Sequence, residues 1–213
     1  MTPNIPEQPI GMDLPDFSVD LGGGESIEKD KVLDSRQLKR KASRVYLQFI
    51  EKKKTFDQAV RAFPGKGEYL HVVNNHKYDF YTILPVAIDR LGTLDEVYIS
   101  TWTMNRNNVV DLFQQFDSGK IKRMTVLTGL YFKRRETAVY SYLVSGLKRR
   151  GQRYVAFKNH CKILLASTDT THLVIEGSAN FTANPRMEQY VFCNSEAVYN
   201  FHKAWMEDCL NDE

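Results

Sequence analysis

The sequence predicts an α/β protein with a central mixed, mostly parallel sheet flanked by helices on both faces. The first observation is an alternation: from about residue 66 onward, short runs rich in β-branched residues are followed by segments with helical periodicity. The second is size, because 213 residues with 42% hydrophobic side chains allow one generous domain with a substantial core. The third is a pair of apolar runs, CKILLAS and THLVIEG, separated only by Thr168, Asp169 and Thr170, which predicts a β-hairpin.

The chain begins with two segments that differ in charge. Residues 1–30 hold four of the seven prolines, the run Gly22-Gly23-Gly24, and seven acidic residues against one lysine. They carry a charge of −6, which leaves +9 on the rest of a chain whose net charge is +3, and we predict a flexible acidic tail. Residues 31–65 are predicted to be a basic helical segment, since apolar residues recur at helical spacing between charged ones until Pro64-Gly65.

The remaining elements alternate along residues 66–213. Strands are expected at 69–73, 96–101, 122–127, 153–157 and 189–193, and helices at 80–91, 108–116, 136–148 and 195–210. The start of the chain lacks the pattern of a secretory signal, and no run approaches about 18 apolar residues, so we expect no membrane partner. Three cysteines cannot all pair, and we interpret Cys161, Cys193 and Cys209 as reduced thiols of a cytoplasmic protein, with Cys161 filling the core.

The hairpin brings two polar segments together. A short loop places His160 opposite Ser178 or Ala179, and Lys162 near Gly177. Since side chains alternate along a strand, His160 and Lys162 are expected to share a face. That face therefore gathers an imidazole, an ammonium and a hydroxyl.

These groups suit a phosphodiester. Lys162 offers three donors and a positive charge to the non-bridging oxygens, and Ser178 and Asn180 add neutral donors. A neutral His160 imidazole can attack phosphorus or carry a proton, provided that an acceptor holds its other ring nitrogen. Glu188 is the nearest downstream carboxylate, and we prefer it to Glu176, which lies within the strand itself. Gly, Ser and Asn are also common turn formers, so their segment taken alone equally fits a structural turn.

These residues resemble the signature of the phospholipase D superfamily, H-x-K followed by G-S-x-N and a trailing acid. The matching residues are His160-Cys161-Lys162, Gly177-Ser178-Ala179-Asn180 and Glu188. The family usually carries an Asp five residues after the Lys, where this chain has Ser167, with Asp169 close by. The resemblance implies that residues 66–213 form a phospholipase D-like catalytic domain. It also implies a phosphodiesterase that needs no metal or other cofactor and forms a covalent phosphohistidine.

The resemblance further implies a homodimer. Sites of this family use two H-x-K elements, and this chain holds one, because no other histidine has a lysine two residues further on. His160 of each protomer would then face one phosphate, one as nucleophile and the other as proton donor to the leaving oxygen. Lys162, Ser178 and Asn180 would hold the developing charge, and Glu188 would orient the imidazole.

The basic remainder of the chain favours nucleic acid, with DNA first, over a neutral small substrate. Tyr131 and Phe132 could stack on bases, and Asn105, Arg106 and Asn107 follow a strand end as secondary candidates. Candidate contacts to the nucleic-acid backbone are Lys133, Arg134, Arg135, Arg153, Lys158 and Arg186. Exposed loops and helix ends also collect cations without any ligand. Two alternatives stay open: a nucleic-acid-binding module of the same fold without turnover, and a soluble phospholipid hydrolase.

Overall fold

The computed structural model describes residues 44–182 and 185–211 of a chain that divides into two compact units, residues 1–49 and 50–213. Of the first unit, only residues 44–49 are described, as the opening turns of α1 (Arg44–Ala59). The predicted acidic tail and the first part of the predicted basic helix, residues 31–43, lie outside the described residues. The sheet and the other helices belong to the second unit.

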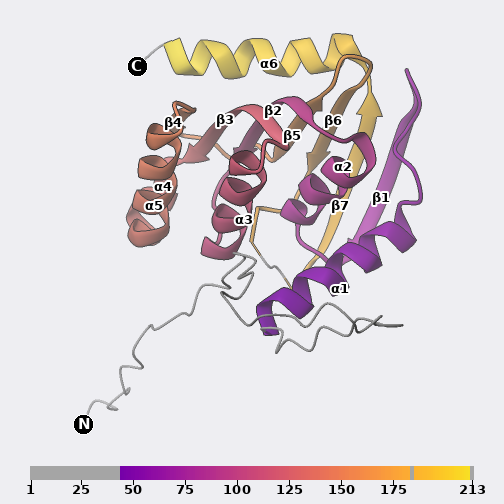
Figure 1. Ribbon diagram of the computed structural model, residues 1–213, viewed down its shortest axis with the longest axis horizontal. Coiled ribbons are helices and arrows are strands. Elements are labelled where there is room, and N and C mark those ends of the chain that lie inside the picture. The colour runs from indigo at the N-terminus through magenta and orange to yellow at the C-terminus, as the bar shows by residue number, and fades with distance from the viewer. Residues whose placement is uncertain (1–43, 183–184, 212–213) are drawn as a thin grey trace, which may run out of the picture. The chain divides into compact units, whose positions relative to one another are not determined.

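A seven-stranded mixed sheet forms the centre of the second unit (Figure 1). Its strands lie in the spatial order β1-β7-β6-β5-β2-β3-β4. Every predicted strand is present, and the predicted hairpin is formed by β5 and β6, in which Ile163 pairs with Glu176. The strands are β1 (Tyr69–Asn75), β2 (Leu94–Thr101), β3 (Ile121–Gly129), β4 (Arg153–Phe157), β5 (Ile163–Ser167), β6 (His172–Gly177) and β7 (Met187–Asn194).

The sheet has fewer parallel neighbours than the sequence predicted. Only β2–β3 and β3–β4 pair in parallel, whereas the other four neighbouring pairs are antiparallel. The connections explain this difference, because helical crossovers join β2 to β3 and β3 to β4, and parallel neighbours need such crossovers. After β4 the chain turns back as β5, and short loops then join β5, β6 and β7 as antiparallel neighbours.

Helices cover both faces of the sheet, as predicted: α6 lies across one side, and α2, α3 and α5 lie on the other (Figure 1). On the second side α3 and α5 touch at Gly146, where an added Cβ would lie 2.2 Å from the Phe113 ring. The short helix α4 was not predicted. No described helix is both long and apolar enough to cross a membrane. After α1 the helices are a 3-10 turn η1 (Phe80–Thr82), α2 (Ile83–Leu91), α3 (Arg106–Asp117), α4 (Leu130–Arg135), α5 (Thr137–Arg149) and α6 (Glu196–Asn211).

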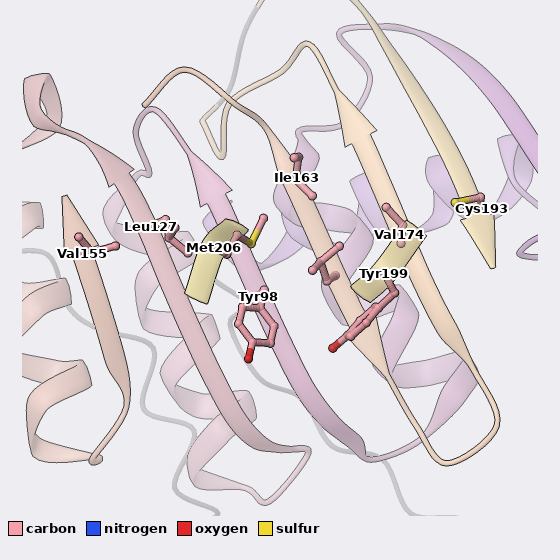
Figure 2. Close-up of a cluster of buried hydrophobic side chains, with 9 residues drawn as sticks. Tyr98, Leu127, Val155, Ile163, Val174, Cys193, Tyr199 and Met206 are labelled. Atoms are coloured by element: carbon pink, nitrogen blue, oxygen red, sulfur yellow. The ribbon is translucent and has the colours of Figure 1, made fainter. Parts of the chain in front are cut away.

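The core beneath α6 takes alternate side chains from six strands. Tyr199 and Met206 of α6 are almost completely buried against this layer (Figure 2). Burying a side chain of this size contributes about 1.5–3 kcal/mol, so each of the two contacts stabilises the packing of α6 on the sheet. The strand residues of the layer are Tyr98, Leu127, Val155, Ile163, Leu165, Val174 and Cys193.

A network of paired polar groups lies under the same helix. The carboxylate of Glu96 lies 2.6 Å from Lys203 and 3.4 Å from Arg123. The Tyr199 hydroxyl lies 3.4 Å from Glu96 and 3.3 Å from the hydroxyl of buried Ser167. Ser167 stands where the resemblance leads one to expect Asp, and its hydroxyl faces α6.

Further along α6, two more ionisable groups find partners. Glu207 accepts the hydroxyl of Tyr98, and burial, followed by this hydrogen bond, raises the pKa of Tyr98. His202 is buried, its Nε2 lies 3.0 Å from Glu176, and its Nδ1 accepts the indole N–H of Trp205 at 3.1 Å. Glu176, the competitor of Glu188 in the sequence, is therefore engaged on the α6 side of the sheet.

Candidate active site

The polar segments identified in the sequence meet at one end of the strands, which we call the carboxyl edge of the sheet. Strands β2, β3, β4 and β6 end at this edge, and β5 and β7 begin there. In α/β folds, ligands usually bind beyond the carboxyl ends of the strands. This edge gathers residues 102–105, 129–131, 158–162 and 177–182, with Glu188 at the start of β7.

His160 is presented by a turn that Asn159 holds in place. Asn159 is buried, its Nδ2 donates to Ser100 Oγ at 2.9 Å, and its Oδ1 accepts the backbone N–H of Cys161 at 2.9 Å. The His160 side chain is exposed, and its ring centre lies 5.9 Å from that of Trp102, with the planes tilted by 55°. The backbone of His160 is thus fixed while its imidazole reaches solvent. No motif in the sequence marked Asn159.

Lys162 is buried just before β5 begins, with 7% of its surface exposed. Its Nζ donates to the carbonyl oxygen of His160 at 2.5 Å, which is its one hydrogen bond within the described part of the chain. Burial lowers the pKa of Lys162, and the neighbouring Cys161 and Glu188 groups oppose this shift. A buried ammonium is costly unless an anion pairs with it, so this position favours an anionic ligand.

The GSAN segment packs directly beside Lys162. The backbone N–H of Gly177 donates to the Lys162 carbonyl at 3.0 Å, which confirms the predicted pairing of these two residues. Only glycine fits here, because an added Cβ would lie 2.7 Å from the Tyr190 ring. Ser178 Oγ donates to the buried carboxylate of Glu188 and accepts a backbone N–H of β7 at 3.0 Å. Ser178 and Glu188 therefore form one hydrogen-bonded pair.

Asn180 is held at the end of β2 by its neighbour Phe181. The Phe181 N–H donates to Thr101 Oγ1 at 3.3 Å, and its carbonyl accepts the N–H of Asn105 at 3.1 Å and Nδ2 of Asn108 at 3.0 Å. The Oδ1 of Asn180 is buried and has no hydrogen-bond partner among the described residues. Buried polar atoms without a partner are uncommon, so this oxygen is available to accept a hydrogen bond from a bound water or from a donor group of a ligand.

An aromatic pair lies between these groups; the sequence marked Tyr131 for stacking on bases but not its partner Trp102. Trp102, directly after β2, stacks on Tyr131 of α4 with ring centres 5.0 Å apart and planes 8° from parallel. Gly129 lies under the indole, where an added Cβ would be 2.4 Å from Trp102 Cδ1. The sequence signal for Trp102 was its place at the carboxyl end of a strand, the same signal that marked Asn105 and Arg106 as secondary candidates.

Two neighbouring hollows share Trp102 and Tyr131. Their volumes are about 520 and 370 Å³, within the range of ligand sites. The imidazole of His160 and the amide of Asn180 therefore line adjoining hollows rather than a single face of a hairpin. The larger hollow is also lined by Arg106 and Arg135, and the smaller one by Arg134 and Lys158.

The predicted basic contacts do not all lie at this edge. Arg153 begins β4, about 13 Å of strand away from the edge, and pairs with Glu207 of α6 at 2.5 Å. The expectation that Arg153 lies beside the site is therefore corrected. Lys133 Nζ lies 5.8 Å from the ring centre of Tyr140, and Arg186 is exposed just before β7.

Cys161 is exposed, so the expectation that it fills the core is also wrong. The physical reason is that β5 begins at Ile163, and strand alternation does not extend back to Cys161. Among residues 44–182 and 185–211, no three His, Cys, Asp or Glu side chains lie close enough together to hold a metal ion.

Comparison with known proteins shows that this chain is similar to solved structures in its fold. No family model and no curated protein match it, whereas 45 chains of solved structures do. One is Nuc from Salmonella typhimurium, a phospholipase D family member, at 16% identity and a TM-score of 0.52, over 68% of this chain and 95% of that one. The chain therefore has a phospholipase D-like fold.

Two other solved structures match less closely. A polyphosphate kinase from Porphyromonas gingivalis is 12% identical with a TM-score of 0.49, over 68% of this chain and 26% of that one. TrmBL2, an archaeal chromatin protein, is 15% identical with a TM-score of 0.46, over 78% of this chain and 63% of that one.

Proposed function

We propose that this chain is a metal-independent phosphodiesterase that hydrolyses nucleic acid, with DNA as the first substrate to test. One observation carries the proposal: on a phospholipase D-like fold, the buried ammonium of Lys162, the exposed imidazole of His160 and the amide of Asn180 lie along the same sheet edge. Lys162 supplies the positive charge, His160 supplies the nucleophile, and Asn180 adds a neutral polar group. Together they match the needs of a phosphoryl group.

In the proposed reaction, the imidazole of His160 attacks phosphorus and forms a P–N bond. The bond from phosphorus to the leaving oxygen breaks, and that oxygen takes a proton from His160 of the partner subunit. The partner's His160 then removes a proton from water, which attacks phosphorus and breaks the P–N bond. The products are a phosphomonoester and an alcohol, and both histidines return to their starting states.

The surrounding groups stabilise charge in this scheme. Lys162 Nζ and Asn180 Nδ2 would donate to the non-bridging oxygens, and donors of this kind are each worth roughly 10²–10³ in rate. Glu188 is the proposed acceptor for the second ring nitrogen of His160, and its hydrogen bond with Ser178 helps to hold it. Lys162 and the imidazolium provide the positive charge that a divalent cation provides in metal-dependent nucleases.

The proposal includes a homodimer because one chain supplies one H-x-K element. The outer strand pair offers a surface for it: β1 is an edge strand, and Tyr69, Val73 and Met187 are 59%, 68% and 66% exposed. Met187 directly precedes Glu188 at the start of β7, so this apolar surface ends at the same end of the sheet as the proposed site, although the two side chains point to opposite faces. Apolar groups exposed together in this way are typical of protein contacts. Val73→Lys should weaken both self-association, measured by light scattering, and hydrolysis.

The central experiment incubates the purified chain with single-stranded DNA, duplex DNA, RNA and phospholipid vesicles in EDTA, beside His160→Ala. We expect nucleic acid to be cut in EDTA and the variant to be inactive. An acid-labile phosphate bound to the wild-type protein after rapid quenching would support the covalent intermediate.

Each other outcome removes a part of the proposal. Cleavage abolished by EDTA contradicts the metal-independent reaction, and cleavage unchanged in His160→Ala contradicts the nucleophile. Salt-sensitive binding without product favours a module that has lost turnover. Hydrolysis restricted to the vesicles favours a phospholipid hydrolase.

A further inference from the structure

Within the Trp102–Tyr131 pair, Tyr131 is more exposed than packing alone requires. Tyr131 keeps 47% of its surface exposed although it stacks on Trp102, and the adjacent Leu130 keeps 42%. The next residue, Phe132, is 1% exposed and anchors α4 in the core. The fold therefore uses Phe132 for stability and leaves Tyr131 at the surface.

The position of Trp102 is fixed on several sides. Its carbonyl accepts the backbone N–H of Gly129 at 3.3 Å, its indole lies on Gly129, and one ring face meets Tyr131. The His160 ring lies 5.9 Å from the indole. A rigid aromatic surface is thus held beside the proposed nucleophile.

Positive charge surrounds the aromatic pair. Arg134 and Lys158 line the hollow that contains His160, and Arg135 lies on the other side, with its guanidinium 5.8 Å from the Tyr131 ring centre. All three are exposed. Aromatic rings that alternate with cations along a hollow are the usual surface for single-stranded nucleic acid, because bases stack on the rings and phosphates lie on the cations.

We infer that Trp102 and Tyr131 form a stacking platform for an unpaired nucleobase next to the phosphate that His160 attacks, so that the protein prefers single-stranded nucleic acid to duplex. The inference rests on the proposed function and extends it to substrate form. A base within a duplex is already stacked and must leave the helix to reach the platform, whereas a single strand offers its bases directly. Arg134 and Lys158 contact the flanking phosphates.

The test uses the full chain with His160→Gln and Trp205→Phe, which prevents cleavage and leaves Trp102 as the one tryptophan of the two in the sequence. Three probes are titrated: a short single-stranded DNA, its duplex, and a strand of equal length with abasic sites in place of the bases. We expect the base-bearing single strand to quench Trp102 fluorescence and to bind about 10- to 100-fold more tightly than the abasic strand.

Three further variants make the test specific. Tyr131→Ala should reduce the affinity for the base-bearing strand to that of the abasic strand, whereas Tyr131→Phe, which keeps the ring, should retain most of it. Phe201→Ala removes an aromatic side chain that is 68% exposed on α6 and should change nothing. Arg134→Ala should weaken binding of both strands, because phosphate contacts do not depend on bases.

Equal affinity for the base-bearing and abasic strands, without quenching, would overturn the platform, and equal quenching by the duplex would overturn the preference. Cleavage by the wild-type chain, measured in parallel, separates the two proposals. If cleavage that depends on His160 persists without quenching, only the platform fails. If base-dependent quenching occurs while no phosphodiester is cut, the platform stands and the proposed hydrolysis fails.

Discussion

The α6 side of the sheet and its carboxyl edge place the same kinds of residue in different surroundings. Under α6, Glu96 contacts Lys203, and His202 contacts Glu176. At the carboxyl edge, Lys162 is buried with a backbone carbonyl as its hydrogen-bond partner, and the Asn180 oxygen has no partner among the described residues. The polar groups under α6 pair with one another, whereas at the edge Lys162 and the Asn180 oxygen have no side-chain hydrogen-bond partner among the described residues. Proteins retain destabilising buried groups of this kind where their activity requires them.

The chain provides matched pairs for this comparison, because each region contains a histidine, a glutamate and a lysine. The same substitution in each member of a pair should remove activity at the edge and stability under α6. The predictions below run from the largest expected effect to the smallest.

The histidine pair should show the largest difference. His160→Ala removes the proposed nucleophile, and we expect hydrolysis to fall by about 10⁴-fold or more. Because the side chain is exposed, the free energy of unfolding should change little. His202→Ala should instead lower the free energy of unfolding by ~2 kcal/mol, since it leaves Trp205 and Glu176 without their contacts.

Cleavage rates on a single-stranded oligonucleotide and urea unfolding curves check both variants. The comparison fails if His202→Ala loses hydrolysis per folded molecule while His160→Ala keeps it.

The glutamate pair tests whether Glu188 acts in catalysis or only in structure. Glu188→Gln keeps the size of the side chain and its contact with Ser178, yet removes the charge that would stabilise an imidazolium. We expect hydrolysis to fall by roughly 10²–10³-fold, mainly in kcat, and its pH profile to shift. Glu96→Gln should leave kcat unchanged and lower the free energy of unfolding by ~1 kcal/mol, because Lys203 and Arg123 lose their anion. A Glu188→Gln variant with normal kcat would assign this carboxylate a structural role.

The sequence was informative about fold because the chain has strong local patterns. β-branched runs and helical periodicity predicted each strand and the major helices, and Arg153–Phe157 was predicted with its observed bounds. Whether neighbouring strands pair in parallel or antiparallel was harder to predict, because it depends on the chain turning back after β4 to form β5. The helix α4 is too short for periodicity to reveal it.

Part of the geometry of the candidate site was predictable, where a motif carried it. The pairing of Lys162 with Gly177 followed from hairpin register, and the structure confirms it. Trp102 and Asn159 could not be found in this way, because they join the edge through contacts between strands far apart in sequence. Arg153 was misplaced for a related reason: a basic residue close in sequence to His160 lies at the other end of a strand.

Alkaline pH should destabilise the folded chain through buried tyrosines, among them the two under α6. Burial is the main cause that raises the pKa of Tyr98 and of Tyr199, both of which start from 10.0. Above pH 10 the folded chain therefore holds protons that the unfolded chain has lost, so the free energy of unfolding falls as pH rises, by at most about 1.4 kcal/mol per pH unit for each phenol.

Denaturant unfolding at a series of pH values checks this, with phenolate absorbance recorded alongside. Tyr199→Phe should flatten the loss of stability above pH 10. If all phenols titrated near pH 10 while the chain stayed folded, these side chains would not be buried as described.

The lysine pair should give the smallest and most informative change in stability. Lys162→Met places an apolar group of similar length in a buried position whose lysine has a pKa lowered by burial. We expect hydrolysis to be lost and Tm to rise by about 2–4 °C, the shift that ~1 kcal/mol produces in a domain of this size. Lys203→Met should lower Tm by a similar amount, because Glu96 loses its closest partner.

The lowered pKa of Lys162 also predicts how the stability difference between the variant and the wild type changes with pH. Below the pKa of Lys162 in the folded chain, both states bind the proton and the folded chain carries the full cost of a buried charge. Between that pKa and the ordinary value of 10.5, the unfolded chain binds a proton that the folded chain has released, so the free energy of unfolding of the wild type rises with pH. The advantage of Lys162→Met should therefore shrink as pH approaches 10.5, which differential unfolding of the two proteins at matched pH measures. A variant less stable than the wild type at every pH tested would mean that Lys162 is satisfied within the folded chain. The contrast between the α6 side and the carboxyl edge would then not hold for this residue.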